Sequence, residues 1–454
     1  MTTDCESRPR LAFYGDSFIG SITAMAQLQW AGIETRLFLS PPSASRLQSD
    51  NNLQAIGLAG SSRSMSPAEM DERLPAMFQI LKNSGAPIVH YVTSTTFDSA
   101  PHVGSIGKAM EIGQRLFGSN PTPILVGAPQ LGQYCVFGNL FARYESEPEP
   151  YRLDHHPEMR AHPITPMSES DIRIHLSQQT QQRIELFDIL ALDREDPDKH
   201  LSTLLKNNPS AILFDVLSLQ QLPTIGSLID ELGESSWPLF VVGSPGVEQA
   251  LTASWNSGKV LPAPPAPRSV DQLLVISGSS APTSQRQVQE AIRHGFISIP
   301  IDPNELLSSH SSETVMKKTI ERTVASLKDG KSVILQTADE EPAESTDTTF
   351  RKLGFSTLDI KLKSGRTFGP RLGAIVKKIL EKHPVERIGV SGGETSGYLA
   401  EALNISDLRA SASVAVGTPL CEAKADGLVD STEIVFKEGK IGAPNLWSSM
   451  LSKH

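Results

Sequence analysis

The chain has 454 residues, of which 39% are hydrophobic and 20% are charged, and its formal net charge is −10. This length suits two or three domains of a globular protein. The negative charge and the absence of a basic run argue against nucleic acid or an anionic membrane as the main partner.

Cysteines and apolar runs exclude further classes of protein. Cys5, Cys135 and Cys421 form no CxxC pair, so neither a disulfide framework nor a zinc site is indicated. Residues 1–6 lack the apolar segment of a secretory signal, and no stretch of about 18 apolar residues predicts a transmembrane helix. We therefore expect a cytoplasmic protein whose partners include neither nucleic acid nor a membrane.

The first half of the chain begins with a βαβ pattern. The apolar run 11–14 predicts a strand and residues 15–21 a turn, and a helix then extends to about Trp30, where Gly32 stops it. A second strand is predicted at 35–39. Further apolar strands are expected, with helical patterns between them, at 88–92, 123–126, 211–214 and 239–242. Strands that alternate with helices indicate a parallel sheet.

A proline-rich run divides the chain. Residues 261–267 contain four prolines in seven positions, so they can form neither a helix nor a central strand. Further strands are predicted beyond this run, at 273–276, 333–335 and 388–390. We predict an α/β fold with two α/β domains, 1–260 and 270–454, joined by a linker at 261–269. We expect both sheets to be largely parallel. The default position for the functional site is a cleft between the two domains.

Three polar turns with glycine occur in the second half, at 277–280, 391–397 and 437–442, each at the end of a predicted strand. Such a turn before a helix presents free backbone N–H groups and the positive end of a helix dipole, which suits a phosphate. The candidate nucleotide-binding residues are Ser279, Gly392, Gly393, Glu394, Thr395 and Gly439. The alternative is that each is an ordinary βα turn. The chain has neither a Walker A motif nor a GxGxxG segment after a strand. Neither a P-loop protein nor a dehydrogenase is therefore indicated.

Polar residues also follow the strands of the first half. Asp16 lies in the first βα turn, Arg63 in a serine-rich segment, and Asp98 just beyond the strand at 88–92. Arginine pairs with carboxylates and aspartate accepts from hydroxyls, so this set suits a polyhydroxy acid. The candidate substrate-binding residues are Ser17, Arg63, Thr96 and Asp98. The alternative is that Asp16 and Asp98 merely cap helices.

A histidine-rich segment at 154–163 is the remaining candidate for chemistry. Histidines that lie close together can ligate a metal ion. The prolines and the irregular spacing of this segment favour a packed loop instead, so we predict no metal-ligating residues in this chain.

Segments in both halves resemble the four-carbon acid sugar kinase family, and the resemblance covers nearly the whole chain. In the second half, the matches are GGETSG at 392–397 with the nucleotide signature, 275–279 with the strand–GS turn, 416–420 with PGxPL, and 437–442 with KxGxxG. In the first half, the matches are 16–20 with DDFTG, 94–99 with CSTFDS, and 162–167 with HPxTPM.

The resemblance implies a sugar-acid-binding domain followed by an ATP-binding domain. It implies an ATP- and Mg²⁺-dependent kinase that phosphorylates a hydroxyl of a small sugar acid. Asp16 would then be the catalytic residue that orients or deprotonates the hydroxyl, Arg63 would hold the substrate carboxylate, and the glycine turns would hold the phosphates. The sequence leaves the oligomeric state open, with a homodimer as one alternative.

The chain also departs from the family pattern. Ser17 stands where the family usually has a second Asp, Ile19 where it has Thr, and Val92 where it has Lys. In the second half, Ala281 replaces a serine. We therefore expect weak activity on ordinary four-carbon sugar acids and a larger or more apolar substrate. The alternative is a diverged member that has lost sugar-acid kinase activity and binds a nucleotide or metabolite, or catalyses another reaction.

Overall fold

The chain forms two compact units, Met1–Ala263 and Pro264–His454. The computed structural model describes residues 8–43, 46–47, 52–144, 147–162, 164–257, 259, 261–279, 281–307, 311–337 and 357–452. Cys5, Pro163 and Ser280, which belong to segments discussed above, lie outside the described residues. The run 261–267 has neither helix nor strand and is largely exposed. Among the described helices, none has the length and apolar character needed to cross a membrane.

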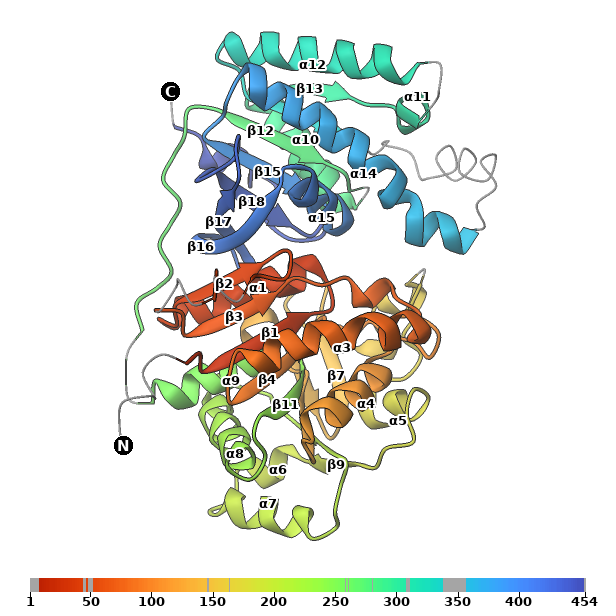
Figure 1. Cartoon of the computed structure of the whole chain (residues 1–454), viewed down its shortest axis with the longest axis vertical. Coiled ribbons are helices and arrows are strands. Elements are labelled where there is room, and N and C mark those ends of the chain that lie inside the picture. The colour runs from red at the N-terminus through yellow and green to blue at the C-terminus, as the bar shows by residue number, and fades with distance from the viewer. Residues whose placement is uncertain are drawn as a thin grey trace. The chain divides into compact units, whose positions relative to one another are not determined.

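The first unit is built on a parallel sheet (Figure 1). Its strands are β1 (Leu11–Gly15), β2 (Thr35–Phe38), β3 (Ala55–Leu58), β4 (Ile88–Val92), β5 (Thr122–Leu125), β9 (Ile184–Phe187), β10 (Ala211–Phe214) and β11 (Leu239–Gly243). They lie in the order β2-β3-β1-β4-β11-β5-β10-β9. The parallel sheet was predicted, but β3, which separates β1 from β2, was not. Gly57 weakens the strand pattern there, and it is needed because a Cβ at this position would come within 2.2 Å of the Phe13 ring.

Helices cover the first sheet. They are α1 (Phe18–Trp30), α3 (Pro67–Asn83), α4 (Ile106–Phe117), α5 (Ile172–Ser177), α6 (Ile189–Leu192), α7 (Pro197–Leu205), α8 (Leu222–Ser235) and α9 (Gly246–Trp255). In Figure 1, α3 and α4 lie side by side over the face of the sheet that is turned to the viewer. There Phe78 of α3 packs against Tyr14, Tyr91 and Phe240. A small antiparallel sheet, β6 (Gln133–Val136), β7 (Asn139–Arg143) and β8 (Pro150–Arg152), completes the unit.

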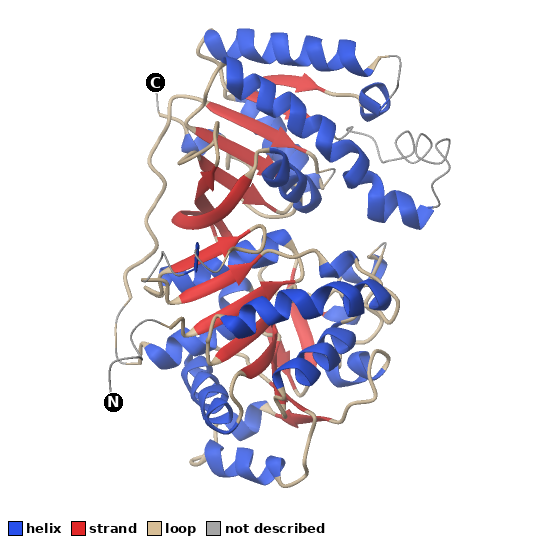
Figure 2. Cartoon of the chain, in the orientation of Figure 1, coloured by secondary structure: helices blue, strands red, loops and turns tan. Residues whose placement is uncertain are grey.

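The second unit has a mixed sheet, which Figure 2 shows in red. Its strands are β12 (Leu273–Ser277), β13 (Ile297–Pro300), β14 (Val333–Gln336), β15 (Arg387–Ser391), β16 (Ile405–Ala415), β17 (Thr418–Ala425) and β18 (Glu433–Lys437), in the order β13-β14-β12-β15-β18-β17-β16. Strands β13, β14, β12, β15 and β18 pair in parallel with their neighbours among these five. Strand β17 runs antiparallel to both of its neighbours, β18 and β16. The β16–β17 hairpin was not predicted, and register shifts interrupt its pairing.

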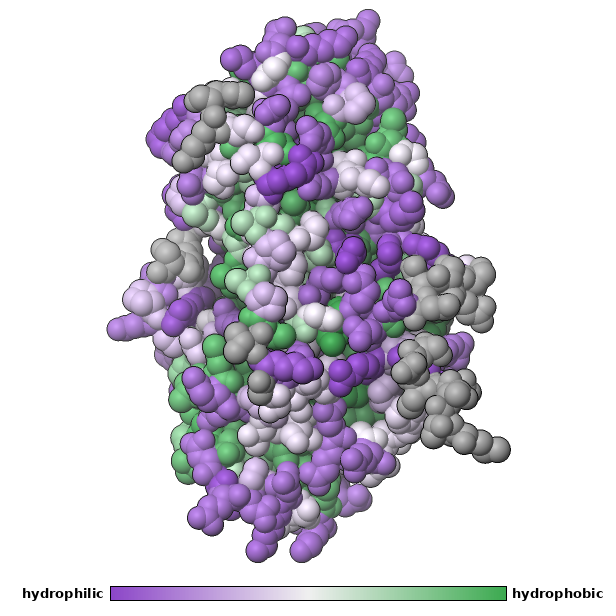
Figure 3. Space-filling model, turned by 90° about the vertical axis from the view of Figure 1, so that its left-hand side faces the viewer, coloured by the Kyte–Doolittle hydropathy of each residue, from purple (hydrophilic) through white to green (hydrophobic). Residues whose placement is uncertain are grey.

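Helices pack against this second sheet as well. They are α10 (Pro282–Arg293), α11 (Pro303–Leu307), α12 (Ser312–Lys328), α14 (Thr357–Lys382) and α15 (Gly393–Ala402). In Figure 1, α12 and α14 lie side by side. Val288 of α10 belongs to a buried cluster with Val275 and Trp447. Hydrophilic residues cover much of the molecular face drawn in Figure 3, with smaller apolar areas between them.

Candidate active site

The first candidate site lies where three neighbouring strands end. Asp16 directly follows β1, Arg63 lies in the 3-10 turn η1 (Ser62–Ser64) after β3, and Asp98 lies in the loop after β4. Parallel strands bring their carboxyl ends to one edge, and β1 lies between β3 and β4. The Asp16 N–H donates to the Val92 carbonyl at 2.8 Å, and the Arg63 N–H donates to the Asp16 carbonyl at 2.9 Å. The backbone therefore fixes the positions from which these side chains start.

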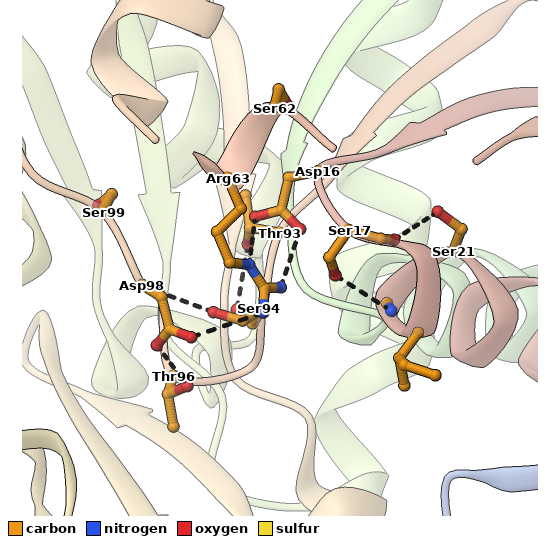
Figure 4. A network of polar contacts seen from close by, with 12 residues as sticks. Asp16, Ser17, Ser21, Ser62, Arg63, Thr93, Ser94, Thr96, Asp98 and Ser99 are labelled. Carbon is orange, nitrogen blue, oxygen red and sulfur yellow. Dashed lines mark hydrogen bonds and ion pairs between the residues drawn. The ribbon is translucent and has the colours of Figure 1, made fainter. Parts of the chain in front are cut away.

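The Arg63 guanidinium lies between two carboxylates (Figure 4). Its Nη2 donates to Asp16 Oδ1 at 2.9 Å and its Nε donates to Asp16 Oδ2 at 3.2 Å. Its Nη1 lies 3.6 Å from Asp98 Oδ2. A bidentate pair of this kind holds both groups in one orientation. The structure thus brings together the residues that the sequence predicted at this edge.

The loop that carries Asp98 is held in an unusual conformation. The Asp98 N–H donates to Ser94 Oγ at 2.8 Å, and Thr96 Oγ1 donates to Asp98 Oδ1 at 2.7 Å. Phe97 is fully buried and has a φ of 56°, in the left-handed region that a phenylalanine seldom adopts. Such strain persists where the surroundings enforce it, and it is concentrated at functional sites.

The environment of Asp16 makes its carboxylate a stronger base than usual. The side chain is only 2% exposed, and this burial raises the pKa of Asp16 above its ordinary value. The charge of Arg63 and its hydrogen bonds oppose the shift, whereas the nearby charge of Asp98 adds to it. A buried carboxylate with a raised pKa is suited to accept a proton from a hydroxyl.

Helix capping does not explain the two aspartates. The N-cap of α1 is Ser17, whose side chain accepts from the Gly20 N–H, and the N-cap of α4 is Ser105. The alternative in which Asp16 and Asp98 serve only as caps is therefore wrong. Gly20 was missed as a site residue, although it belongs to the DxFxG segment. A Cβ there would lie 2.9 Å from Ser17 Oγ, so this glycine leaves room for the hydroxyl that caps α1 beside Asp16.

The three positions of the first unit that depart from the family pattern differ in their burial. Val92 is fully buried on β4 and Ile19 is 5% exposed on α1. Ser17 is half-buried, and its hydroxyl serves the helix cap. The substitutions at 19 and 92 therefore change the buried surroundings of Asp16 rather than an exposed surface.

The second candidate site lies in the second unit, where its glycine turns meet. Strand register places Ser277, Ser391 and Lys437 in one row at the carboxyl ends of β12, β15 and β18. The turns that follow are in contact. A Cβ at Gly278 would lie 2.1 Å from Thr395 Oγ1, and a Cβ at Gly439 would lie 1.9 Å from Ser279 Oγ.

The middle turn opens directly into a helix. Gly392 is the N-cap of α15 and has a φ of 118°, which a residue with a side chain rarely adopts. Gly393 starts the helix, and Glu394 is an exposed residue of its first turn. Backbone N–H groups without helical partners therefore lie at the point where the three turns meet, which fits the phosphates of a nucleotide.

A buried lysine beneath these turns was missed as a site residue. Lys437 is 1% exposed, and its Nζ lies 3.0 Å from Ser391 Oγ. Burial lowers the pKa of Lys437 to about 7, whereas the charge of Glu438 acts to raise it. The KxGxxG segment contained this lysine, but a sequence does not show that its side chain turns inward.

The histidine-rich segment is a packed loop, as favoured above. His156 Nδ1 accepts from the Glu158 and Met159 N–H groups, each at 3.2 Å, and His162 Nδ1 accepts from the Thr165 N–H at 3.1 Å. Within the described ranges, no group of three or more His, Cys, Asp or Glu side chains could hold a metal ion.

Comparisons with known proteins match both units. A model described as a sugar-binding N-terminal domain matches residues 11–251, and one described as a nucleotide-binding C-terminal domain matches residues 274–446. A 3-oxo-isoapionate kinase of Paraburkholderia graminis is 38% identical over 95% of this chain and 92% of its own length. A 3-oxo-tetronate kinase of Pseudomonas savastanoi is 25% identical over 98% of each chain, and a D-threonate kinase of Salmonella typhimurium is 23% identical over 96% of each.

Solved structures show the same fold. A crystal structure from Salmonella typhimurium LT2 has a TM-score of 0.76 at 21% identity and covers 96% of this chain and 97% of its own. A Haemophilus influenzae structure has a TM-score of 0.69 at 18% identity, with 96% and 98% covered.

Fold, relatives and matched domains together define a phosphotransferase with a sugar-binding domain and a nucleotide-binding domain. The chain belongs to the four-carbon acid sugar kinase family and is a kinase of a small sugar acid.

Proposed function

We propose that the protein transfers the γ-phosphoryl group of ATP to a hydroxyl of a 3-oxo sugar acid, with 3-oxo-isoapionate as the first candidate. The observation that supports this most is the Asp16–Arg63–Asp98 cluster, which combines a buried base with groups that bind hydroxyls. The relative that shares 38% of its residues is named for 3-oxo-isoapionate, whereas those named for 3-oxo-tetronate or D-threonate share 25% or less.

In this mechanism, Asp16 accepts the hydroxyl proton and aligns the oxygen for attack. Thr96 and Asp98 hydrogen-bond neighbouring hydroxyls. Arg63 already faces both carboxylates, so it keeps two like charges close together, and a substrate carboxylate would share it with Asp16. The turns at Ser279, Gly392–Thr395 and Gly439 hold the phosphates, and bound ATP supplies the phosphoryl group.

Three further features belong to this proposal. Mg²⁺ enters with the nucleotide, because it prefers phosphate oxygens and water to a protein cage. The protein acts in the cytoplasm, as its composition led us to expect. A homodimer is the oligomeric state to test, by light scattering on the purified protein.

A substrate panel tests the proposal. ATP consumption is measured with 3-oxo-isoapionate, 3-oxo-tetronate and D-threonate, and we expect kcat/KM for 3-oxo-isoapionate to be at least about tenfold higher, a difference of about 1.4 kcal/mol. A tetronate turned over at ordinary kinase rates, about 1–100 s⁻¹, would contradict the altered specificity. ATP binding without turnover of any of the three would instead favour the diverged, non-kinase alternative.

A further inference from the structure

Lys437 is a buried lysine to which the proposed mechanism assigns no role. It lies at the end of β18, and its Nζ is within reach of three oxygens: Ser391 Oγ at 3.0 Å, Ser284 Oγ at 3.3 Å and the Gly439 carbonyl at 3.5 Å. In the described part of the chain it forms no ion pair with a carboxylate. A buried ammonium with only neutral partners is costly, so burial favours the neutral amine in the free protein.

The geometry around Lys437 fixes which group donates and which accepts in each hydrogen bond. Ser284 Oγ donates to the Gly439 carbonyl at 2.7 Å and therefore accepts from Ser391 Oγ, which lies 2.8 Å away. Ser391 Oγ in turn accepts from Lys437 Nζ. Each hydroxyl has a single hydrogen, so this order follows from the geometry.

This chain of hydrogen bonds joins all three glycine turns. Ser391 immediately precedes Gly392, Ser284 lies in the first turn of α10 after the Gly278–Ser279 turn, and Gly439 belongs to the third turn. Gly439 also touches the first turn directly, since a Cβ on it would overlap Ser279 Oγ. Through these hydrogen bonds, one side chain connects the three turns.

We propose that Lys437 is the positioning residue of the nucleotide site, and that its neutral amine takes up a proton to become an ammonium when phosphate binds. This inference rests on the proposed nucleotide site. The anionic phosphates supply the negative charge that the buried ammonium lacks, so binding favours the protonated form. The charged group that acts on Lys437 is Glu438, while α10 and β15 present serine hydroxyls to it.

The test is calorimetry of ADP, with Mg²⁺ in excess, binding to the full chain at pH 8 in buffers of different ionisation enthalpy. A group with a pKa of about 7 is about one-tenth protonated at pH 8, so the wild type should take up about 0.9 proton per ADP. Lys437→Met should abolish this uptake and weaken ADP binding at least tenfold. Lys437→Gln keeps a donor without the charge and should also abolish the uptake.

Lys424→Met is the matched control, because Lys424 is an exposed lysine of the same unit that pairs with Asp430. It should behave as the wild type. Equal proton uptake by the wild type and by Lys437→Met would overturn the inference and leave the nucleotide site intact. A wild type that does not bind ADP would overturn the nucleotide site itself, and the inference with it.

The wild type alone provides a second measurement if the variants do not fold. Between about pH 7.5 and 9 its affinity for ADP should fall about tenfold per pH unit, because binding must then supply the proton. An affinity that stays constant over this range would overturn the inference.

Discussion

Replacing a single oxygen of Asp16 should separate its role as a base from its role in folding. Asp16→Asn keeps the size of the side chain but cannot accept the hydroxyl proton, so we expect kcat to fall by about 10²–10⁴. The affinity for ADP should not change, because Asp16 lies in the other unit from the glycine turns.

Asp71→Asn is the matched control for this prediction, since Asp71 is a half-exposed carboxylate of α3 that pairs with Lys108. It should retain full activity. Retention of wild-type kcat by Asp16→Asn in steady-state kinetics would show that another group accepts the proton.

Lys437 should also make the stability of the free protein depend on pH. Its pKa is about 7 in the folded chain and is depressed from its ordinary value of 10.5, so between these values the unfolded chain binds more protons. Stability should therefore rise as pH increases from about 7 to 10, and the penalty should be complete below pH 7. Urea unfolding of the free protein should show this slope, and Lys437→Met should flatten it relative to Lys424→Met.

Residues at strand ends could be predicted from the sequence, whereas those beneath them could not. Asp16 and Asp98 were found because each follows an apolar strand, and parallel strands end at one edge. Ser284 and Lys437 were missed because their role depends on side chains that turn inward from a helix and from a strand end. Nothing in the spacing of a sequence shows that Ser284, Ser391 and Lys437 form one buried group.

At the scale of elements, the contact between the third glycine turn and the first should be sensitive to one methyl group. Gly439→Ala places a Cβ 1.9 Å from Ser279 Oγ, so one of the two turns must move. We expect affinity for ADP to fall at least tenfold, a cost of about 1.4 kcal/mol, as measured by calorimetry.

The control is Gly233→Ala in α8, where an added Cβ would meet its nearest neighbours at 3.9 Å. This variant should bind ADP as the wild type does. Unchanged binding by Gly439→Ala, with a normal unfolding transition, would remove the third turn from the site.

Strands were predicted accurately where apolar residues follow one another without a break. Strands 88–92 and 211–214 have the bounds that were expected, because each is buried along its whole length. The strand β3 was missed because Gly57 interrupts its apolar run. The β16–β17 hairpin was missed because many of its residues are small or exposed, so no apolar run marks it.

At the scale of the whole molecule, we expect proteolysis to cut first beside the proline-rich run. Lys259 and Arg268 are exposed residues that flank it, so trypsin should release fragments that end there before it cuts either unit. Mass spectrometry of a short digest checks this prediction and the boundaries 1–260 and 270–454. The double variant Lys259→Gln with Arg268→Gln should lose these early cuts. Early cuts within a sheet would show that the boundaries are misplaced.

The order of strands also constrains when each unit can form during synthesis. β11 is the last strand of the first unit in sequence, yet it lies between β4 and β5, and β18 is the last of the second, yet it lies between β15 and β17. A growing chain that lacks this strand has a sheet divided into two separate parts. Each unit should therefore complete its fold only after the ribosome has released its final strand, and a truncation just before that strand should leave no folded domain.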